Sequence, residues 1–393
     1  METFFRTHQY LVEHVQSPVR RLLMDEIDWS QRLIGIKGSR GVGKTTFLLQ
    51  YAKDNFKKDD NSCLYINFNN FYFTIHSLIE FAEWFVQQGG RTLLIDQTFK
   101  YENWSKELRE CYDLFPELKI VFSGSSVMRL KEDNPDLQDV VSGYNLRGFS
   151  FREFLNLQSG KNFQPYTFEE ILKNHVQICK EIVNQIHPLD YFQDYLHHGY
   201  YPFFLEHRNF SENLLKTMNM MLEVDILLIK QIELKYLSKI RKLLYLLMIN
   251  SPVAPNISQL SSEIQTSRAT VMNYIKYLKD ARLLNLLYPV GDQFPKKPHL
   301  IYGHNTNLLH AVMPGNVDKH IEEKTFLYNS LHSRHKVNAG KYHADFIVDE
   351  KYLVKCGQKM HSSKNHSKII YAANGIEIGK KNEIPLWLFG FFY

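Results

Sequence analysis

The stretch LIGIKGSRGVGKTTFLLQ, residues 33–50, decides the fold of the first part of this chain. An apolar run of β-strand character is followed by a glycine-rich turn, residues 38–45, and then by a segment of helical character. The turn carries the complete GxxxxGK[ST] pattern between a strand and a helix, which is the setting of a phosphate-binding loop. A glycine-rich turn that binds nothing is the alternative, and the completeness of the pattern argues against it.

Each residue type in this loop has a physical role in holding a nucleoside triphosphate. Glycines let the backbone curl until successive N–H groups point at the phosphates, and the following helix adds its positive end. Lys44 is expected to reach the β- and γ-phosphates, and the Thr45 hydroxyl to bind Mg²⁺. ATP is favoured over GTP because no NKxD sequence that reads guanine is present. The predicted nucleotide contacts are Gly38, Ser39, Arg40, Gly41, Val42, Gly43, Lys44, Thr45 and Thr46.

Strand-like and helix-like segments alternate after the loop, as they do in an α/β sheet. The predicted strands are CLYINFN (63–69), TLLID (92–96) and KIVFSGSS (119–126), and the predicted helices are SLIEFAEWFVQQ (77–88) and WSKELRECYDLF (104–115). The order predicts a P-loop core.

Three polar residues follow these strands where a nucleotide site would need them. Asp96 closes a strand and is predicted to hold Mg²⁺; capping of the next turn is its alternative role. Gln97 follows it, and its neutral amide can position water but is a very poor base. Ser123 is predicted to contact the γ-phosphate, although Ser123 and Ser125 are also typical turn formers.

Composition excludes several classes of protein. The 393 residues are 44% hydrophobic and 23% charged, which fits a globular chain of two or three domains. A net charge of +5 permits contact with nucleic acid without arguing for it. The four cysteines form no CxxC pair, and neither a signal sequence nor an apolar run of membrane-spanning length is present, so we expect a cytoplasmic protein. The closing IPLWLFGFFY (384–393) is expected to be a buried strand.

Several motifs together resemble one known family. GIKGSRGVGKTT, LLIDQTFKYENW, IVFSGSS, GFSFREFL and EIPLWLFGFFY are similar, in this order, to motifs of prokaryotic AAA-type P-loop ATPases that carry a C-terminal restriction-nuclease-like domain of unknown function, of the DUF4143 type. The resemblance runs over nearly the whole chain. It implies a P-loop core, a helical lid, a winged-helix region and a C-terminal α/β nuclease-like domain.

The chain departs from this family at catalytic positions. The family usually has Glu where Gln97 stands, and a pair of arginines where this chain has Gln138-Asp139-Val140. Arginine at such a place contributes several orders of magnitude to phosphoryl transfer. The departures predict nucleotide binding with weak or absent hydrolysis, unless Arg40, Arg129, Arg147 or a residue from a partner compensates.

The middle of the chain reads as helical and then as a helix-turn-helix. Residues 256–289 contain a short helix, a turn at 265–267 and a second helix from Arg268 to Leu278, which suits a winged helix. The side chains expected to face outward are Arg268, Thr270, Asn273 and Lys276. DNA binding and docking of a protein both remain open for this region.

The C-terminal ADFIVDEKYLVKCGQK (344–359) looks like the two-stranded centre of a restriction-nuclease fold. Such a site needs two or three acidic oxygens for Mg²⁺. Asp345 fits the first role, but Lys355 stands at the second, with Gly357 and Lys359 on the same face, and Lys324 replaces the family's usual helical Glu. We therefore predict that nuclease activity is absent. No histidine is spaced as a ligand pair with a supporting cysteine, so no further metal site is expected.

These inferences give an α/β protein with four regions. They are an ATPase core (1–150), a helical lid and linker (151–250), a winged helix (251–298) and a degenerate nuclease-like domain (299–393). Nucleotide state is expected to control contacts between regions, with a protein partner or within a homo-oligomer. The alternatives are an active ATPase that uses a partner's residue, and a DNA-binding module that binds nucleotide incidentally.

Overall fold

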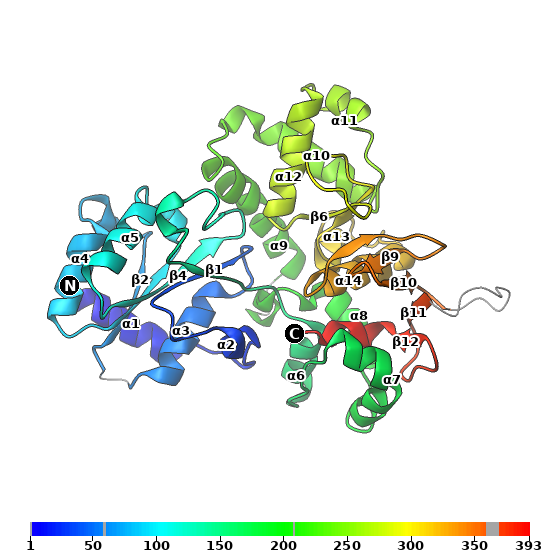
Figure 1. Ribbon diagram of the computed structural model, residues 1–393, viewed down its shortest axis with the longest axis horizontal. Helices are drawn as coiled ribbons and strands as arrows, with labels where there is room; N and C mark the ends of the chain where they lie inside the picture. Colours follow the sequence, from blue (N-terminus) through cyan, green and yellow to red (C-terminus); the bar gives the residue numbers. More distant parts are fainter. Residues whose placement is uncertain (1, 58–59, 207–208, 359–368) are drawn as a thin grey trace. The chain divides into compact units, whose positions relative to one another are not determined.

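The computed structural model describes residues 2–57, 60–206, 209–358 and 369–393. The chain divides into two compact units, one ending at Gly148 and the other beginning at Phe149. Each is an α/β structure, which confirms the predicted fold class (Figure 1). None of the described helices is long and apolar enough to span a membrane.

The first unit is built on a parallel sheet with the strand order β2-β3-β4-β1-β5. The strands are β1 (Leu33–Gly38), β2 (Cys63–Asn67), β3 (Thr92–Asp96), β4 (Lys119–Ser125) and β5 (Ser142–Asn145). β3 is buried along its whole length and β1 nearly so. Near-continuous burial of this kind is expected for parallel strands with helices on both faces, and it explains their apolar sequences.

Helices cover both faces of this sheet and one of its edges. Figure 1 shows α3 on one side and α4 with α5 on the other. α1 packs along the edge strand β2, and its Phe4 and Phe5 contact rings of α4. The helices are α1 (Glu2–His14), α2 (Leu23–Glu26), α3 (Lys44–Asn55), α4 (Leu78–Gln87) and α5 (Trp104–Leu114); short 3-10 turns are Phe71–Thr74, Thr98–Lys100 and Pro135–Leu137.

The second unit begins with helices that pack on its C-terminal sheet. Side chains of α6, α7 and α8 share one buried core with the last residues of the chain, including Phe154, Phe168, Phe192, Trp387 and Phe389. Residues 151–250 are predicted to form a helical lid and linker. In the structure, α6, α7 and α8 contribute to the core of the C-terminal sheet. Their bounds are α6 (Phe151–Ser159), α7 (Phe168–Val183) and α8 (Leu189–Asp194), continued by a π-helical turn (Tyr195–Gly199) and a 3-10 turn (Pro202–Glu206).

The middle of this unit is helical and ends in a small hairpin. A turn after α10 forms an isolated β-bridge between Val253 and Ile301, and the hairpin of β6 and β7 follows α12. The order of elements here is helix, bridge, helix, turn, helix and hairpin, and the winged helix stays a prediction. The elements are α9 (Phe210–Met220), a π-helical segment (Met221–Leu228), a 3-10 turn (Leu234–Tyr236), α10 (Leu237–Ile249), α11 (Ile257–Glu263), α12 (Arg268–Asp280), β6 (Leu284–Leu287), β7 (Leu300–Gly303) and α13 (Thr306–Val312).

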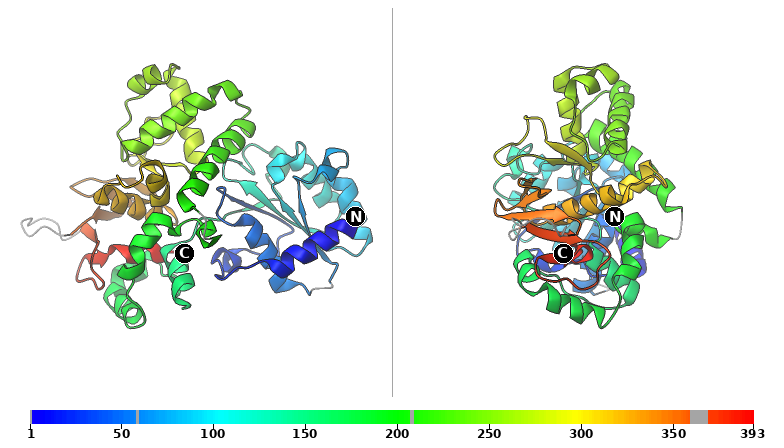
Figure 2. Two further views of the ribbon diagram at one scale, coloured as in Figure 1. Left: turned by 180° about the vertical axis from the view of Figure 1, so that it is seen from behind. Right: turned by 90° about the vertical axis from the view of Figure 1, so that its right-hand side faces the viewer.

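The C-terminal sheet has the order β12-β11-β10-β9-β8, with β8, β9 and β10 antiparallel and β10, β11 and β12 parallel. α14 packs against this sheet (Figure 2). The sheet is mixed and follows a helix, and its nuclease-like character stays a prediction. The elements are α14 (Lys319–His332), β8 (Val337–Ala339), β9 (Phe346–Val348), β10 (Tyr352–Cys356), β11 (Ile369–Ala373) and β12 (Glu383–Pro385).

The closing apolar segment differs from its prediction. It is buried, but β12 ends at Pro385 and the following residues, Leu386–Phe391, form a 3-10 helix. The predicted strand is therefore wrong for most of the segment. A short apolar run that is buried on all sides lacks the polar alternation that separates strand from helix, so the sequence alone could not decide.

Candidate functional site

The loop after β1 has glycines at positions where its backbone requires them. Gly41 and Gly43 have φ angles of 84° and 92°, a region that favours glycine. A Cβ atom on Gly38 would lie 2.4 Å from the carbonyl oxygen of Leu146, so a side chain cannot be accommodated there. α3 then begins at Lys44, with its N-terminal end at the loop. These three glycines are required by geometry.

The other loop residues differ in how much of their side chains is exposed. The Lys44 ammonium donates to the carbonyl oxygens of Gly38 (2.8 Å) and Ser39 (2.9 Å), so it lies across the loop. The Ser39 and Val42 side chains are buried, so Val42 can contribute only its backbone to a ligand. Arg40, Thr45 and Thr46 are partly or fully exposed.

Asp96 lies beside the loop and is almost fully buried, with 1% of its surface exposed. One carboxylate oxygen accepts hydrogen bonds from the Thr45 hydroxyl (2.6 Å) and the Tyr65 hydroxyl (2.9 Å). The other accepts from the Ser123 hydroxyl and from the Gln97 backbone N–H (3.0 Å). Four neutral donors thus stabilise the carboxylate without cancelling its charge.

The strand order explains how these residues meet. β4 lies between β1 and β3, so its carboxyl end reaches the space between the loop and Asp96. Ser123 contacts Asp96 from there. Ser125 is paired in register with Gly38, and its hydroxyl accepts from the Val127 N–H (3.4 Å), which is a turn-forming contact. The two serines therefore have different surroundings.

Gln97 is held in a specific orientation at the mouth of the site. Its backbone has a φ of 56°, and its N–H donates to Ser123 Oγ (3.1 Å) as well as to Asp96. Its side-chain oxygen accepts from the Asn69 amide (2.9 Å). The side chain is partly exposed, and it offers no group that takes a proton near neutral pH.

Tyr65 and His8 belong to this site, although the sequence analysis missed them. Burial, and then the neighbouring Asp96 carboxylate, raise the pKa of the Tyr65 hydroxyl, so it remains a donor. The Tyr65 N–H donates to His8 Nδ1 of α1 (3.0 Å), which satisfies an edge-strand group. Burial lowers the pKa of His8 to about 4, so the ring is neutral and can accept. The signal available in the sequence was Tyr65, whose side chain ends in a polar hydroxyl, within the mostly apolar strand CLYIN.

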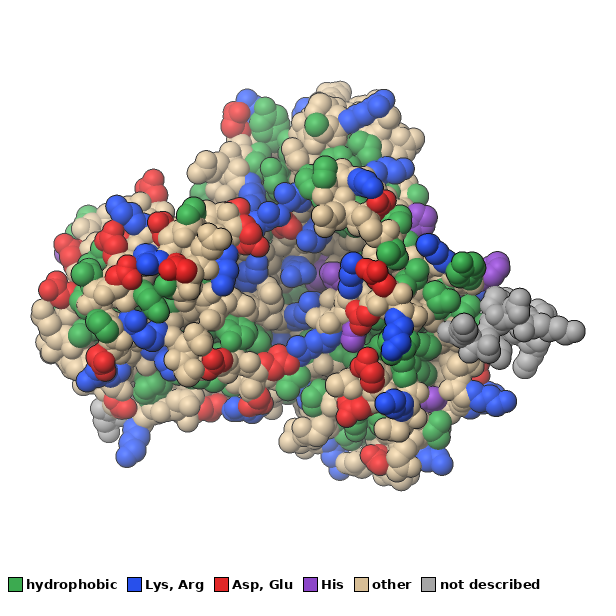
Figure 3. All heavy atoms as spheres, in the orientation of Figure 1, with side chains coloured by type: hydrophobic (Ala, Val, Ile, Leu, Met, Phe, Trp, Pro, Cys, Tyr) green, Lys and Arg blue, Asp and Glu red, His purple; other side chains and the backbone are tan. Residues whose placement is uncertain are grey.

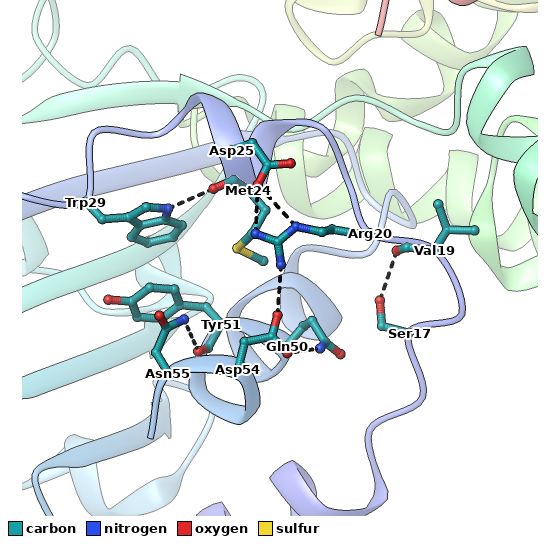
Figure 4. Close-up of polar contacts among 10 residues, drawn as sticks. All are labelled: Ser17, Val19, Arg20, Met24, Asp25, Trp29, Gln50, Tyr51, Asp54 and Asn55. Carbon is teal, nitrogen blue, oxygen red and sulfur yellow. Dashed lines mark hydrogen bonds and ion pairs between the residues drawn. The ribbon is translucent and has the colours of Figure 1, made fainter. Parts of the chain in front are cut away.

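The segment before β1 braces the P-loop helix (Figure 4). Arg20 forms ion pairs with Asp25 (2.7 Å) and with Asp54 of α3 (3.3 Å). Trp29 donates to the Met24 carbonyl (2.8 Å) and stacks on Tyr51 of α3 with ring centroids 4.0 Å apart.

A buried arginine also ties this segment to the loop itself. Arg21 donates to the carbonyl oxygens of Val42 (3.1 Å), Arg147 (2.6 Å) and Gly148 (3.1 Å). The hydrogen bond to Val42 thereby holds the backbone of the glycine-rich loop in place.

The arginine candidates follow the carboxyl ends of three strands of the sheet: Arg40 after β1, Arg129 after β4 and Arg147 after β5. In the stretch Gln138-Asp139-Val140, Asp139 forms an ion pair with Arg109 of α5 (2.7 Å).

In the region predicted to be nuclease-like, Asp345 directly precedes β9 and has two polar partners on its side chain. The Lys324 ammonium of α14 pairs with one carboxylate oxygen (2.7 Å), and the Cys356 N–H donates to the other (2.9 Å). Both side chains of the pair are mostly buried, with 22% and 18% exposed. Lys355 lies in β10 and Gly357 just after it, with a φ of 109°, while Lys359 lies outside the described residues.

A group of possible metal ligands lies beside this pair. His320, Glu323 and Cys356 have ligand atoms within 4.8 Å of one another. The expectation of no further metal site relied on sequence spacing, which does not reveal a contact between α14 and β10.

The predicted reading helix is α12, and its outward residues differ in their surroundings. Arg268 and Asn273 are exposed. Thr270 contacts the capping Ser267 hydroxyl (2.8 Å), and the Lys276 ammonium lies 4.6 Å from the ring centroid of Phe294 in the hairpin loop. Arg268 and Asn273 are therefore the more accessible of the predicted reading residues.

Two parts of the chain match models of known domains. Residues 30–155 match the model of an AAA domain (AAA_14), which supports an AAA-type P-loop domain of the nucleotide-binding ATPase class in this part of the chain. Residues 189–302 match a domain of unknown function (DUF8612). This middle match is a different domain from the DUF4143-type domain that the resemblance implied for the C-terminal part.

The chain is similar to an uncharacterized protein of Methanocaldococcus jannaschii, with 27% identity over 279 residues, or 68% of this chain. It spans 59% of that relative's length. Among solved structures, the Aeropyrum pernix ORC1 protein in complex with DNA has 10% identity and a TM-score of 0.31, covering 80% of this chain and 92% of that one. C. elegans PCH-2 has 14% identity and a TM-score of 0.24, covering 71% and 67%. TM-scores below 0.5 support no structural argument.

Proposed function

We propose that this protein binds ATP with Mg²⁺ through Gly38–Thr45, and that it hydrolyses ATP slowly or not at all. The observation that carries the proposal is the 2.6 Å hydrogen bond from the Thr45 hydroxyl to Asp96, directly after the glycine loop. A hydroxyl and a carboxylate in contact at the start of α3 are the pair that P-loop proteins use to hold Mg²⁺.

The residues present fit both groups. Gly38, Gly41 and Gly43 leave room for a polyanion against backbone N–H groups, and Lys44 supplies a positive charge. Thr45 and Asp96 offer the oxygen ligands that Mg²⁺ prefers. Bound Mg²⁺ would neutralise charge on the phosphate oxygens, and Ser123 would stand between Asp96 and the γ-phosphate.

Weak hydrolysis is proposed from the chemistry of Gln97. Its amide is held by Asn69 and cannot accept the proton of an attacking water. The stretch that replaces the family's arginine pair is held by Arg109 instead of carrying a positive charge of its own. An active ATPase that takes its missing group from a partner is the competing proposal. Phosphate release that persists through purification and disappears in Asp96→Ala would favour it.

We further propose that nucleotide state controls contacts between the predicted regions 1–150, 151–250, 251–298 and 299–393, or with a partner protein or second copy. In this proposal the last region is a DUF4143-type, nuclease-like domain without cleavage activity, since Lys324 neutralises Asp345. A reducing, cytoplasmic setting is supported by four cysteines that are free and buried.

Fluorescent mant-ATP titration tests nucleotide binding. Lys44→Ala removes the ammonium that lies across the loop, and we expect affinity to fall at least roughly tenfold. Lys57→Ala, an exposed lysine beyond the end of α3, is the matched control and should bind like the unaltered protein. Equal affinity for all three proteins would remove the proposal.

A second candidate function is DNA binding through α11 and α12. The specific observation is the helix-turn-helix order, with Arg268 and Asn273 exposed near the start of α12. Charge alone does not favour it, because the net charge of the chain is only +5 and Figure 3 shows both acidic and basic side chains on the visible face of the unit that contains α11 and α12.

Duplex binding at several salt concentrations tests this candidate. Arg268→Ala should weaken binding and lower the salt slope by about 1 if Arg268 contacts a phosphate. Lys180→Ala, an exposed lysine of α7, should leave both unchanged. Binding that is insensitive to salt or equal in both variants would exclude the helix-turn-helix as the DNA contact.

A further inference from the structure

A cluster of three different ligand types lies in the second unit, at the start of α14. His320 and Glu323 are three residues apart and therefore lie on the same face of this helix. Cys356 ends β10, against which α14 packs. One ligand atom from each lies within 4.8 Å of the others, and His320 Nδ1 is 4.0 Å from Glu323 Oε2.

A neighbouring amide holds the carboxylate of this cluster in place. The Asn374 amide donates to Glu323 Oε1 (2.7 Å), while the Asn374 side-chain oxygen accepts from the Gly375 N–H (2.8 Å). Oε2 of Glu323 is left on the side of His320. A carboxylate with one oxygen held by a donor and the other turned to a ligand group is the arrangement that orients a metal ligand.

Burial differs across the cluster. Cys356 and Glu323 are buried, with 2% and 8% exposed, whereas the His320 side chain is 56% exposed. A cation would thus be held from the protein interior by sulfur and oxygen, and from the surface by nitrogen. Solvent could reach it on the His320 side.

The local charges favour a cation. A carboxylate oxygen of Glu323 lies within 4.8 Å of the Cys356 sulfur, and Asp345 accepts a hydrogen bond from the Cys356 N–H. The nearby positive charge of Lys324 is already paired with Asp345 at 2.7 Å. The buried Glu323 carboxylate has the neutral Asn374 amide and the His320 ring as its polar contacts among the described residues. A divalent ion would provide the missing positive charge and replace the thiol proton.

We propose that His320, Glu323 and Cys356 form a zinc site with a fourth position open to solvent. Nitrogen, oxygen and sulfur together are the donors that Zn²⁺ accepts, whereas Mg²⁺ and Ca²⁺ take oxygen ligands. Three protein ligands with one open position complete a tetrahedron. This site is distinct from the Mg²⁺ position of a nuclease, since Asp345 is engaged by Lys324 and by the Cys356 N–H.

Cobalt substitution in the full-length, chelator-treated protein tests the site. Co²⁺ bound through Cys356 should give a near-ultraviolet thiolate charge-transfer band that saturates at one equivalent and disappears when Zn²⁺ is added. The P-loop site offers only oxygen ligands, so it cannot give this band, and Lys44→Ala should leave it unchanged. Failure of nucleotide binding and failure of the zinc site are therefore separately visible.

Three variants assign the ligands. Cys356→Ser should abolish the band, and His320→Ala, at an exposed position that folding does not need, should weaken Zn²⁺ binding at least roughly tenfold. Asn374→Ala should weaken it by about 10–100-fold through the loss of the Glu323 contact. Cys179→Ser and His187→Ala, a buried cysteine and an exposed histidine of the same unit, are matched controls that should bind like the unaltered protein.

The opposite results overturn the proposal. They are the absence of a thiolate band in the unaltered protein, a band that persists in folded Cys356→Ser, or Zn²⁺ affinity that His320→Ala leaves unchanged. If Cys356→Ser does not fold, His320→Ala alone decides, because its side chain contributes little to the core.

Discussion

Asp96 in the first unit is the last residue of a buried strand and Asp345 in the second directly precedes one, and their surroundings are opposite. Asp96 accepts hydrogen bonds from three hydroxyl groups and one backbone N–H, all neutral. Asp345 is paired with the Lys324 ammonium at 2.7 Å. None of the four groups that donate to Asp96 is positively charged, whereas the Lys324 ammonium already balances the charge of Asp345.

The difference teaches that a single acid at a strand end does not define a metal site. Neutral donors stabilise a buried carboxylate and can yield to an incoming ion. A lysine stabilises the same carboxylate by taking the place of that ion. The chemistry of the two units is therefore set by what surrounds each aspartate.

Reversing the charge of Lys324 should remove the difference between the two aspartates and have the largest effect of the changes considered. Lys324→Glu replaces an ion pair that is mostly buried with a repulsive pair, and we expect a loss of about 3 kcal/mol in the free energy of unfolding. Millimolar Mg²⁺ should restore part of this loss, since two carboxylates would then face each other. Denaturant titration with and without Mg²⁺ measures both effects.

Lys336→Glu is the matched control for this charge reversal, because Lys336 pairs with Glu350 at an exposed site. It should cost below about 1 kcal/mol and show no Mg²⁺ dependence. Equal losses in the two variants would mean that the Lys324–Asp345 pair has no special role.

Supplying a base beside Asp96 should sharpen the contrast. Gln97→Glu places a carboxylate where Asn69 can orient it, and phosphate release should increase about 100-fold, or about 2.7 kcal/mol in the barrier. Steady-state phosphate release measures the change. Gln88→Glu, at an exposed residue just after α4 that precedes the opposite end of β3 from Asp96, is the control. An unchanged rate would show that the missing base is not what limits hydrolysis.

The smallest expected effect concerns His8. This ring accepts a hydrogen bond from the Tyr65 N–H, and the Tyr65 hydroxyl in turn donates to Asp96. His8 has a folded pKa of about 4, below its usual 6.5, so the unfolded chain binds the extra proton as the pH falls. Stability from the neutral ring is therefore complete above pH 6.5 and is lost toward pH 4, by about 2 kcal/mol between pH 7 and pH 5.

Unfolding of His8→Gln checks this, because the amide can still accept from the Tyr65 N–H but does not titrate. The variant should lose less stability over the same pH range. An identical pH dependence in both proteins would contradict the role given to His8.

Much of the first site could be predicted from sequence because its signals are local. The glycine loop, the Lys44 and Thr45 that follow, and Asp96 at the end of an apolar strand all lie within short, regular segments. Tyr65 and His8 could not be predicted, because their contacts join residues from different elements. The C-terminal segment after Pro385 was assigned wrongly, since burial on all sides leaves no periodicity to interpret.

By itself the sequence determined the glycine-rich loop and its flanking strand and helix, because backbone conformation there depends on glycine and on hydrogen bonds between near neighbours. It also determined which acids are missing, because that is a matter of residue identity. Only the tertiary structure decided that β4 brings Ser123 to Asp96, that Lys324 reaches Asp345, and that Cys356 meets His320 and Glu323. These contacts depend on the pairing of strands and the packing of α14, which no local pattern encodes.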